Sequence, residues 1–484
     1  MQQLSQQKRS AYRVDPGFQN KLKASHNGET LKFCFQCGAC TSVCPISRYI
    51  NIYRPNQMIE LAKLGIRNLP QSNAFLFCSA CTLCTKGCPQ DVKVHEVMQA
   101  LKEQATGDAE VTDFMAELFD ETLEALGRQM PLPVIYSWIC LRPDDGESAF
   151  HNAVMAAFDR LLKQPVPQAV PVTESKRVAI IGSGPAGLTA AWVLAEAGVA
   201  VTIFEGLPEL GGMLRTGIPS YRLPKDILDL EINKIAALGV EMKTDTPVDK
   251  PFFESLVKDY SAVFIATGAY MSRRLRLEGI ELNGVVDAVD FLEAYNLASK
   301  TAKVGKNVAV IGGGNVATDA AGVALRCGAE SVKLFCLEDR KTMPAHEWEI
   351  EEIARDGVQL NPSWGPRAIL GDGGNVTAVE FVRCKSVLDK DGRFAPVFDE
   401  KSTQTVPADT VVCAIGQAPD LSFLGEGVDT ASGVIQADPY TMETNLPGVF
   451  AGGDAVSGTA SLIEAVSAGK TAAQSIMLYM GVDK

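Results

Sequence analysis

The sequence lacks the features that would assign the chain to a membrane or to nucleic acid. No stretch approaches the roughly 20 consecutive apolar residues that cross a bilayer. The N-terminus has no apolar core of the kind found in signal peptides. The net charge is −13 and the basic residues form no cluster, which argues against a nucleic-acid-binding surface. We therefore expect a cytoplasmic protein with no membrane span and no nucleic-acid partner.

Several common catalytic centres are also missing. The 4 histidines form no metal-ligand pattern, and there is no sign of a Ser–His nucleophile or of an amide-transferring Cys near the N-terminus. After Cys88, no two cysteines stand at the C-x2-C or C-x4-C spacing of a redox-active pair. The sequence therefore offers no redox-active pair of thiols through which electrons could leave. We expect the scattered cysteines to be small buried hydrophobes: Cys140, Cys327, Cys336, Cys384 and Cys413.

The sequence does contain two cysteine runs of one pattern. Each follows the spacing C-x2-C-x2-C-x3-C-P. The short spacings let three thiolates turn onto one iron–sulfur cube, and the fourth Cys is directed to the other cluster in two-cluster ferredoxins. Zinc is the alternative, but zinc sites use two Cys pairs and need neither a third Cys nor a following Pro. The pattern predicts two [4Fe–4S] clusters, one held by Cys34, Cys37, Cys40 and Cys88, the other by Cys78, Cys81, Cys84 and Cys44.

The residues around these runs have helical periodicity. Pro55 suits the first turn of a helix. The apolar residues that follow are spaced for one helical face: Met58, Ile59, Leu61, Ala62 and Leu64. A second helical piece runs through Val92, Val97, Met98 and Leu101. We therefore expect residues 1–105 to form an α-helical ferredoxin-like domain with two clusters.

A dinucleotide-binding fingerprint begins at Lys176. A short apolar strand, Val178–Ile181, leads into a glycine turn and then an Ala/Leu-rich helix. In this context the glycines permit a tight turn and close approach of a pyrophosphate, while the helix N-terminus offers free N–H groups. The next strand ends at Glu205, whose carboxylate can accept hydrogen bonds from a ribose. We expect this turn to bind a dinucleotide through Gly182, Gly184, Pro185, Ala186 and Gly187.

The same pattern returns at Asn307. A strand over 308–311 is followed by a glycine turn, a helix and a second strand that ends at Glu338. Ala317 replaces the third glycine. Two such fingerprints predict two dinucleotides, and the pair is far more specific than either alone. The residues expected to contact the second one are Gly312, Gly314, Asn315, Val316, Ala317 and Glu338.

Other glycine-rich segments fit a flavin. A loop after Glu205 resembles one that lies against a flat ring, and a buried strand over 261–268 ends in Ala-Thr-Gly. A second such strand, 410–416, closes the second unit, after which the chain returns to the first. An Asp at the start of the last helical region can hydrogen-bond the ribityl chain. These segments contribute Gly212, Met213, Ile218, Gly268, Gly416, Gly453 and Asp454 to the expected cofactor sites.

Residues Lys176–Lys484 resemble the small (beta) subunit of glutamate synthase and its relatives. The resemblance rests on the segments GSGPAGL, GGMLRTGIP, IATG, GGGNVATDAA, MPAHEWE, AIGQAPD and FAGGDAVSG. Residues 30–105 resemble instead the C subunit of heterodisulfide reductases and the related iron–sulfur subunits of fumarate reductases. In the glutamate synthase relatives, an arginine pair stands at the positions of Leu337 and Glu338. The resemblance therefore implies NAD(H) rather than NADP(H), because Glu338 would repel a 2′-phosphate.

These observations predict an α/β fold with two Rossmann-like domains preceded by the helical ferredoxin-like domain. We expect a helical connector and linker over 106–175, an FAD-binding domain over 176–300 and 417–484, and an NAD(P)-binding domain over 301–416. The predicted function is an NAD(P)H:acceptor oxidoreductase that moves electrons between NAD(H), FAD and two [4Fe–4S] clusters. Its partners would be redox protein subunits of a larger complex, or a ferredoxin. The alternatives are a glutamate synthase small subunit and a non-catalytic electron-transfer or scaffold subunit.

Overall fold

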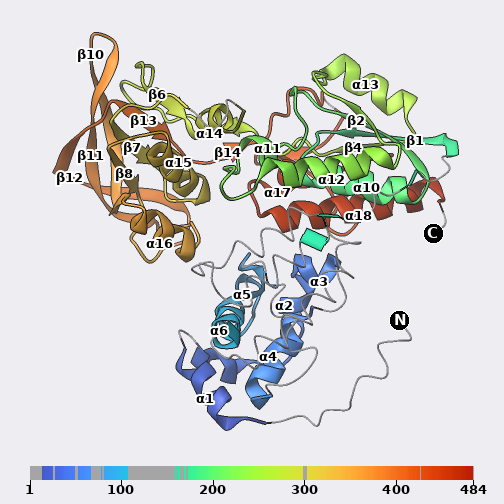
Figure 1. Ribbon diagram of the computed structural model, residues 1–484, viewed down its shortest axis with the longest axis horizontal. Helices are drawn as coiled ribbons and strands as arrows, with labels where there is room; N and C mark the ends of the chain where they lie inside the picture. Colours follow the sequence, from blue (N-terminus) through green and yellow to red (C-terminus); the bar gives the residue numbers. More distant parts are fainter. Residues whose placement is uncertain are drawn as a thin grey trace. The chain divides into compact units, whose positions relative to one another are not determined.

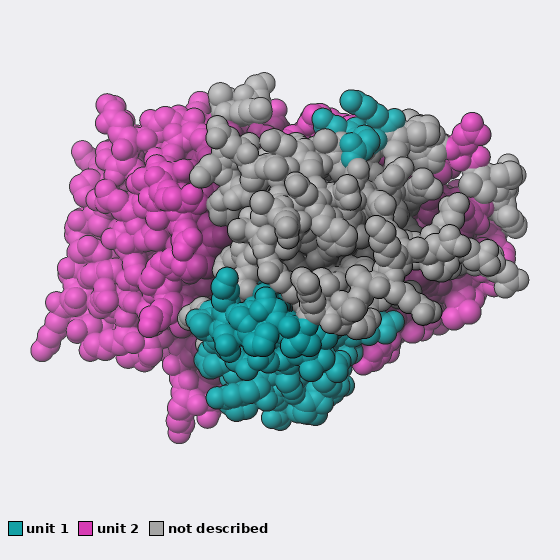
Figure 2. Space-filling model, turned by 60° about the horizontal axis from the view of Figure 1, so that its bottom comes forward, with its two compact units in different colours: residues 1–166, 461–467 teal, residues 167–460, 468–484 magenta. Residues whose placement is uncertain are grey.

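The computed structural model describes residues 14–25, 28–49, 53–66, 78, 81–106, 173–297, 302–425 and 427–482, with a few residues between 159 and 169. Most of the connector predicted over 106–175 therefore lies outside the described residues. The chain divides into two compact units (Figure 2). The first unit comprises residues 1–166 and 461–467, and the second comprises residues 167–460 and 468–484. Within the described part of the chain, no helix is both long enough and apolar enough to span a membrane.

The described residues of the first unit's N-terminal part form short helices and one isolated bridge, between Val14 and Ile66 (Figure 1). This confirms the prediction of an α-helical ferredoxin-like region. The elements are α1 (Pro16–Ala24), η2 (Gly28–Phe33), α2 (Ala39–Ser42), α3 (Pro45–Tyr49), α4 (Pro55–Leu64), α5 (Leu83–Lys86) and α6 (Val94–Thr106).

Helix α4 follows its sequence pattern closely, with one exception. It begins at Pro55 and ends where Gly65 adopts a left-handed conformation, with φ of 65°. Met58, Ile59 and Ala62 are buried, as their spacing predicts. The prediction that Leu64 shares this face is wrong, because its side chain is 51% exposed. Leu64 lies two residues beyond Ala62, which is roughly 200° around a helix of 3.6 residues per turn.

The second unit contains two parallel five-stranded sheets that share the arrangement of four strands. The fifth, an edge strand, comes last in the chain in the first sheet and first in the second. In each sheet the glycine-turn strand is central, flanked by the next strand on one side and by a later strand on the other. The first sheet has the order β17 (Val449–Ala451), β4 (Ala262–Ile265), β1 (Thr173–Ile181), β2 (Val199–Phe204) and β3 (Glu241–Lys243). The second has the order β6 (Val285–Asp287), β13 (Thr410–Cys413), β7 (Asn307–Ile311), β8 (Ser331–Cys336) and β9 (Gln359–Pro362).

Helices of the second unit connect and cover these strands (Figure 1). Those that follow the glycine turns are α10 (Pro185–Glu196) and α15 (Asn315–Arg326). The others are α11 (Met213–Thr216), α12 (Lys225–Ala237), α13 (Lys250–Asp259), α14 (Ala288–Leu297), α16 (Glu347–Arg355), α17 (Asp454–Ser457) and α18 (Leu462–Met480), of which α18 begins in residues assigned to the first unit. Strand β17 returns from the C-terminal part of the chain and pairs in parallel with β4. The first sheet is thus built from segments on both sides of the second sheet in the sequence.

An antiparallel sheet of three strands adds to the second Rossmann-like sheet, and the sequence analysis did not identify it. Its strands are β10 (Trp364–Asp372), β11 (Asn375–Leu388) and β12 (Phe394–Pro407). Phe381 of β11 stacks on Phe335 of β8, with ring centroids 3.7 Å apart. Two short pairs complete the unit: β5 (Met271–Ser272) with β14 (Gln417–Ala418), and β15 (Thr430–Ala431) with β16 (Val434–Ile435).

Candidate functional site

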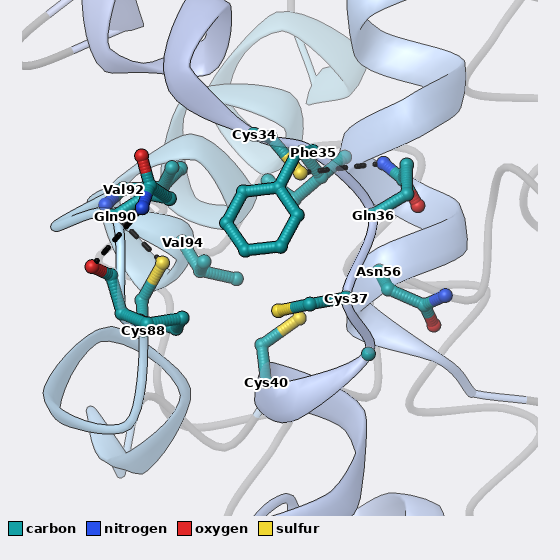
Figure 3. Close-up of a pocket in the computed structure, with 13 residues that line it drawn as sticks. Cys34, Phe35, Gln36, Cys37, Cys40, Asn56, Cys88, Gln90, Val92 and Val94 are labelled. Carbon is teal, nitrogen blue, oxygen red and sulfur yellow. Dashed lines mark hydrogen bonds between the residues drawn. The ribbon is translucent and has the colours of Figure 1, made fainter.

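Four cysteines from the two runs line one pocket in the first unit (Figure 3). Cys34, Cys37 and Cys40 come from the first run and Cys88 from the second. The loop before α2 turns inward at Gln36 and Gly38, which have φ of 62° and 81°. The short helix α2 then carries Cys40. The structure therefore brings together the four thiols that the spacing assigns to one cluster.

Hydrogen-bond donors surround the sulfur atoms of this pocket. Gln36 Nε2 donates to Cys34 Sγ and the backbone N–H of Val92 donates to Cys88 Sγ, both over 3.3 Å. Burial raises the pKa of Cys40 to about 11, and the neighbouring thiols add to the shift. Neutral thiols are therefore favoured here until cationic iron compensates the buried thiolates. Donors to sulfur further stabilise the thiolates when iron is bound.

The other four cysteines form a second and more enclosed set. Cys44, Cys78 and Cys84 are buried, and Cys81 is half-buried. Burial raises the pKa of Cys81 to about 11, and the charges of Cys78 and Cys44 add to the shift. The first-run residue Cys44 thus lies near the second-run cysteines, as the crossed pattern requires. Burial raises the pKa of Tyr53 above its usual value, and the charges of Cys78, Cys44 and Cys84 add to the shift, so this tyrosine lies near the same group.

Neither set has the geometry of a single-ion site. Among the residues that the structure describes, no three His, Cys, Asp or Glu side chains converge as one metal ion requires. In a [4Fe–4S] cluster each thiolate binds a different iron, so the sulfur atoms surround a wider space than in a zinc tetrahedron. The four thiols around the pocket in Figure 3 fit the wider group.

The two glycine turns in the second unit have equivalent geometry. Gly182 and Gly312 have φ of 99° and 143°. Each donates its N–H over 2.8 Å to a carbonyl near the end of the neighbouring strand: Gly182 to Phe204 of β2, and Gly312 to Phe335 of β8. A Cβ on Gly182 would lie 2.5 Å from the carbonyl oxygen of Ala266, and one on Gly312 would lie 2.2 Å from that of Ala414. Any side chain would therefore displace the backbone at the end of β4 in the first case and of β13 in the second.

The helices that follow the turns present free N-terminal donors. Gly184 and Gly314 are the N-caps of α10 and α15, and neither helix receives a side-chain cap. A Cβ on either glycine would meet no atom within 4 Å, so open space lies in front of both helix ends. Pro185 and Ala186 open α10, whereas Asn315, Val316 and Ala317 open α15. This arrangement fits a pyrophosphate at each helix N-terminus.

The carboxylate of Glu205 closes the first turn. Its Oε2 accepts from the N–H of Ser183 over 2.9 Å and from the Ser183 hydroxyl over 2.5 Å, while Oε1 accepts from Leu207 N–H. The Ser183 hydroxyl also accepts from Gly211 N–H over 2.9 Å. Oε2 thus accepts two hydrogen bonds, whereas Oε1 accepts one and retains a lone pair. Glu205 is thus held at the turn, and its Oε1 has capacity for one of the ribose hydroxyls that we predicted it to bind.

Glu338 lies against the second turn in the corresponding place. A Cβ on Gly313 would lie 3.1 Å from Glu338 Oε2. The neighbouring Arg340 points to another carboxylate, since its Nη1 and Nη2 donate to Glu347 over 2.8 and 2.5 Å. The side chain of Asn315 accepts from His346 N–H over 3.1 Å, which joins the helix start to the segment before α16. The carboxylate, rather than the guanidinium, is therefore adjacent to the glycine turn.

The residues predicted to contact a flavin lie near the first turn and in the segments that return to it. A Cβ on Gly212 would lie 2.9 Å from Gly184 Cα, which places the loop against the turn. Met213 opens α11, and Ile218 follows this helix. Gly268 faces open space beside Thr267, whose buried hydroxyl has no hydrogen-bond partner in the described part of the chain. Gly453 is the N-cap of α17 and Asp454 its first residue, whereas Gly416 lies at the β5–β14 link, where Arg273 N–H donates to its carbonyl.

A buried ionic cluster in this unit was missed by the sequence analysis. Arg222, in the segment after the flavin loop, lies among three carboxylates: Nε is 3.1 Å from Asp319, Nη1 is 2.5 Å from Glu349 and Nη2 is 3.3 Å from Glu352. Its guanidinium also stacks over Trp348 at 5.0 Å. The preceding Tyr221 stacks in the same way under Arg326, at 3.8 Å. These contacts join the flavin-loop segment to α15 and α16.

The scattered cysteines form no redox pair among the described residues. Cys336, Cys384 and Cys413 are buried and Cys327 is half-buried, and all four are free thiols. Burial raises the pKa of Cys336 and of Cys413 to about 12. These thiols are therefore protonated and unreactive near neutral pH. Cys140 lies outside the described residues.

Comparisons with known proteins agree with this organisation. The family model "Pyridine nucleotide-disulphide oxidoreductase" matches residues 176–470, and "4Fe-4S dicluster domain" matches residues 30–92. The beta subunit of NADPH-Fe(3+) oxidoreductase from Geobacter sulfurreducens is 32% identical, over 92% of this chain and 70% of that protein. The beta subunit of NADP(+)-dependent formate dehydrogenase from Moorella thermoacetica is 47% identical, over 64% of this chain but only 44% of that protein.

Further similarities support the resemblance to glutamate synthase and the fold. The Escherichia coli glutamate synthase [NADPH] small chain is 33% identical, over 63% of this chain and 69% of that protein. The solved structure of FprA from Mycobacterium tuberculosis in complex with NADPH superposes with a TM-score of 0.55 at 22% identity, over 63% of this chain and 84% of FprA. The chain therefore belongs to the pyridine nucleotide-disulphide oxidoreductase family, in its glutamate synthase small-subunit-like branch, and carries a 4Fe–4S dicluster domain on its N-terminal side.

Proposed function

We propose that the chain takes electrons from a reduced pyridine nucleotide and passes them to a redox protein partner through FAD and two [4Fe–4S] clusters, as a subunit of a larger complex. The observation that carries the proposal is the gathering of eight cysteines into two sets of four, in a chain that also holds two glycine turns with open helix ends. FAD, when bound, supplies the change from two-electron to one-electron transfer. The protein holds the phosphates, the ribose hydroxyls and the iron.

The test combines composition with activity. The purified chain, kept free of oxygen, should hold about eight irons and one FAD, since each set of four thiolates holds one four-iron cluster. It should also reduce an artificial dye with NADH. Zinc in place of iron, or about four irons per chain, would contradict the assignment. A chain that binds FAD but reduces no dye with either nucleotide would instead be the non-catalytic subunit.

The proposal includes a preference for NADH. It is supported by the position of Glu338 beside the glycine turn and by the engagement of Arg340 with Glu347. A 2′-phosphate close to Glu338 would meet a like charge, whereas ribose hydroxyls can donate to it. The names of the relatives from Geobacter sulfurreducens and Moorella thermoacetica point the other way, towards NADP(H). Measurement of kcat/KM with each nucleotide decides between them.

The identity of 47% to a formate dehydrogenase beta subunit favours one candidate for the complex. In that role the chain would exchange electrons with a formate-oxidising subunit. Co-purification with such a subunit, and formate-dependent reduction of the flavin in the complex, would support this role. Co-purification with a large amidotransferase subunit would favour the glutamate synthase alternative instead.

A further inference from the structure

We infer that the surface around the Cys34–Cys37 pocket is the docking site for an acidic one-electron carrier protein. The inference rests on the proposed function, because it assumes that electrons leave through the clusters. It goes further by naming the cluster from which electrons leave, which is the one assigned to the Cys34 set, and by naming the docking surface and the charge of the partner. We call this surface the pocket rim and define it by Lys32, Phe33, Phe35, Arg54, Lys63 and Leu64.

The two cysteine sets differ in exposure. Cys37 is exposed, and Cys34 and Cys88 are half-buried. In the other set Cys44, Cys78 and Cys84 are all buried. A protein partner can therefore approach the Cys34 set more closely than the Cys44 set. This difference makes the Cys34 set the point from which an electron reaches a partner.

One large apolar side chain is exposed in the lining of this pocket, and two more are exposed on residues next to ones that line or contact it. Phe35 lines the pocket, lies in front of its thiols in Figure 3, and is 59% exposed. Phe33 and Leu64 are each 51% exposed. Leu64 adjoins Lys63, whose Nζ donates to the carbonyl of Cys34 over 2.8 Å, so it belongs to the same neighbourhood. Exposed apolar side chains grouped around a functional group are characteristic of a protein-binding surface.

The charge of this region is opposite to that of the chain. Residues 30–92 contain six Lys or Arg and two Asp or Glu, a net charge of +4, whereas the whole chain carries −13. Lys32 lies next to Phe33, with Nζ 4.9 Å from the ring centroid. Arg54 is exposed at the start of α4, two residues before the pocket residue Asn56. A rim of this kind attracts an acidic surface and repels a basic one.

The test measures binding of two probes of opposite charge to the intact chain: a small acidic [2Fe–2S] ferredoxin and a basic c-type cytochrome, both oxidised. Calorimetry should show that the ferredoxin binds and that its Kd rises as salt is raised from 50 to about 300 mM, because exposed charges are screened. The double variant Lys32→Glu, Arg54→Glu should weaken this binding at least tenfold at low salt, with iron and FAD contents as in the wild type. Phe35→Ser should weaken it several-fold and leave the salt dependence unchanged.

The control is Lys385→Glu, Lys401→Glu, which makes the same charge change on exposed residues of β11 and β12. This variant should change the ferredoxin Kd less than twofold. Equal weakening by both double variants, an unchanged Kd in the rim variant, or preferential binding of the cytochrome would overturn the inference. If the rim variant loses iron, its Kd is not interpretable and the wild type provides the test. A wild-type ferredoxin Kd that does not change with salt would then overturn the inference. A wild type that binds ferredoxin through the rim but never reduces it would remove the proposed function and leave the docking site standing.

Discussion

Arg222 lies 3.1 Å from Asp319 and thereby ties the flavin-loop segment to the helix that opens at the second glycine turn. Asp319 stands one turn after Asn315, the first residue of α15. On the other side, Lys225 anchors the same segment by donating to the carbonyls of Leu214 and Ile218, over 2.7 and 2.6 Å. The ionic cluster therefore connects the loop predicted to contact the flavin with the helix predicted to hold the nucleotide. Its position makes Arg222 a positioning residue between the two.

Replacing Arg222 should slow flavin reduction by the nucleotide without loss of FAD. Arg222→Met leaves three acidic groups near one another with no guanidinium, and removing one partner of a buried ion pair typically costs about 3–5 kcal/mol. We expect at least a tenfold lower rate of flavin reduction in stopped-flow measurements. Arg222→Lys should recover part of this rate, because lysine keeps the positive charge but lacks the planar guanidinium that can donate to several carboxylates at once.

Arg383→Met is the matched control for this change. Arg383 also stacks on a tryptophan, Trp364, at 5.3 Å, but it lies on the added antiparallel sheet. Its replacement should leave the rate of flavin reduction within twofold of the wild type. Equal rates in the wild type and in Arg222→Met would show that the cluster does not position the nucleotide domain.

The same cluster predicts a pH-dependent stability. Burial raises the pKa of Asp319 to about 7, against the lowering effect of Arg222, and the charges of Glu349 and Glu352 add to the increase. The folded state therefore holds a proton that the unfolded state releases near pH 4, so this contribution to stability is lost as the pH rises through about 7. Asn at this position resembles the protonated form of Asp319. The Tm of Asp319→Asn relative to that of the wild type should therefore rise by on the order of 3 °C when the pH is raised from 5.5 to 8.

Asp356→Asn serves as the control for the pH series. Asp356 pairs with Arg326 over 3.3 Å, but both side chains are more than a third exposed. The difference in Tm between this variant and the wild type should stay constant over the same pH range. A constant difference for Asp319→Asn as well would contradict a buried, protonated Asp319.

Patterns confined to one short segment were predictable, whereas contacts between distant segments were not. The strand, turn and helix from Val178 to Glu196 follow from neighbouring residues, and the same holds for the second fingerprint. The cysteine spacings likewise act locally. Arg222 and Glu349, in contrast, are 127 residues apart, and neither has a motif around it that predicts a partner.

The added antiparallel sheet was missed for a different reason. Strands β11 and β12 are 14 residues each and largely exposed on one side, so polar and charged residues interrupt their apolar pattern. Their buried residues, such as Phe381, become recognisable only when β8 lies against them. Leu64 shows the reverse case, since an apolar residue near a helical pattern was assigned to the core although its angle on the helix points elsewhere.

Nucleotide preference should respond to Glu338 and to Glu347. Two like charges about 4 Å apart cost about 4 kcal/mol at an effective dielectric constant of 20, and solvent reduces this, so we expect a ten- to hundredfold preference for NADH in kcat/KM. Glu338→Arg should shift the preference towards NADPH. Glu347→Gln should shift it in the same direction but less, because it releases Arg340. A wild type that prefers NADPH, or a Glu338→Arg variant with no shift, would refute this role of Glu338.

The crossed ligation is testable with four single substitutions. Cys81→Ser and Cys37→Ser each damage one cluster according to every assignment, and their electron paramagnetic resonance spectra serve as references. Cys44→Ser should then match Cys81→Ser, because Cys44 lies with the second-run thiols. Cys88→Ser should match Cys37→Ser, since both line the same pocket. The opposite matching would show that each run holds its own cluster.

Removing residues 1–105 tests most directly whether electrons leave through the clusters. The second unit has its own cores and both glycine turns, so the shortened chain should keep FAD, which is checked first, and its flavin should still be reduced by NADH. Reduction of the acidic ferredoxin, measured as turnover with the full chain as reference, should fall to background. Ferredoxin reduction at the full-chain rate by the shortened chain would contradict the account, because the electrons would then leave without the clusters.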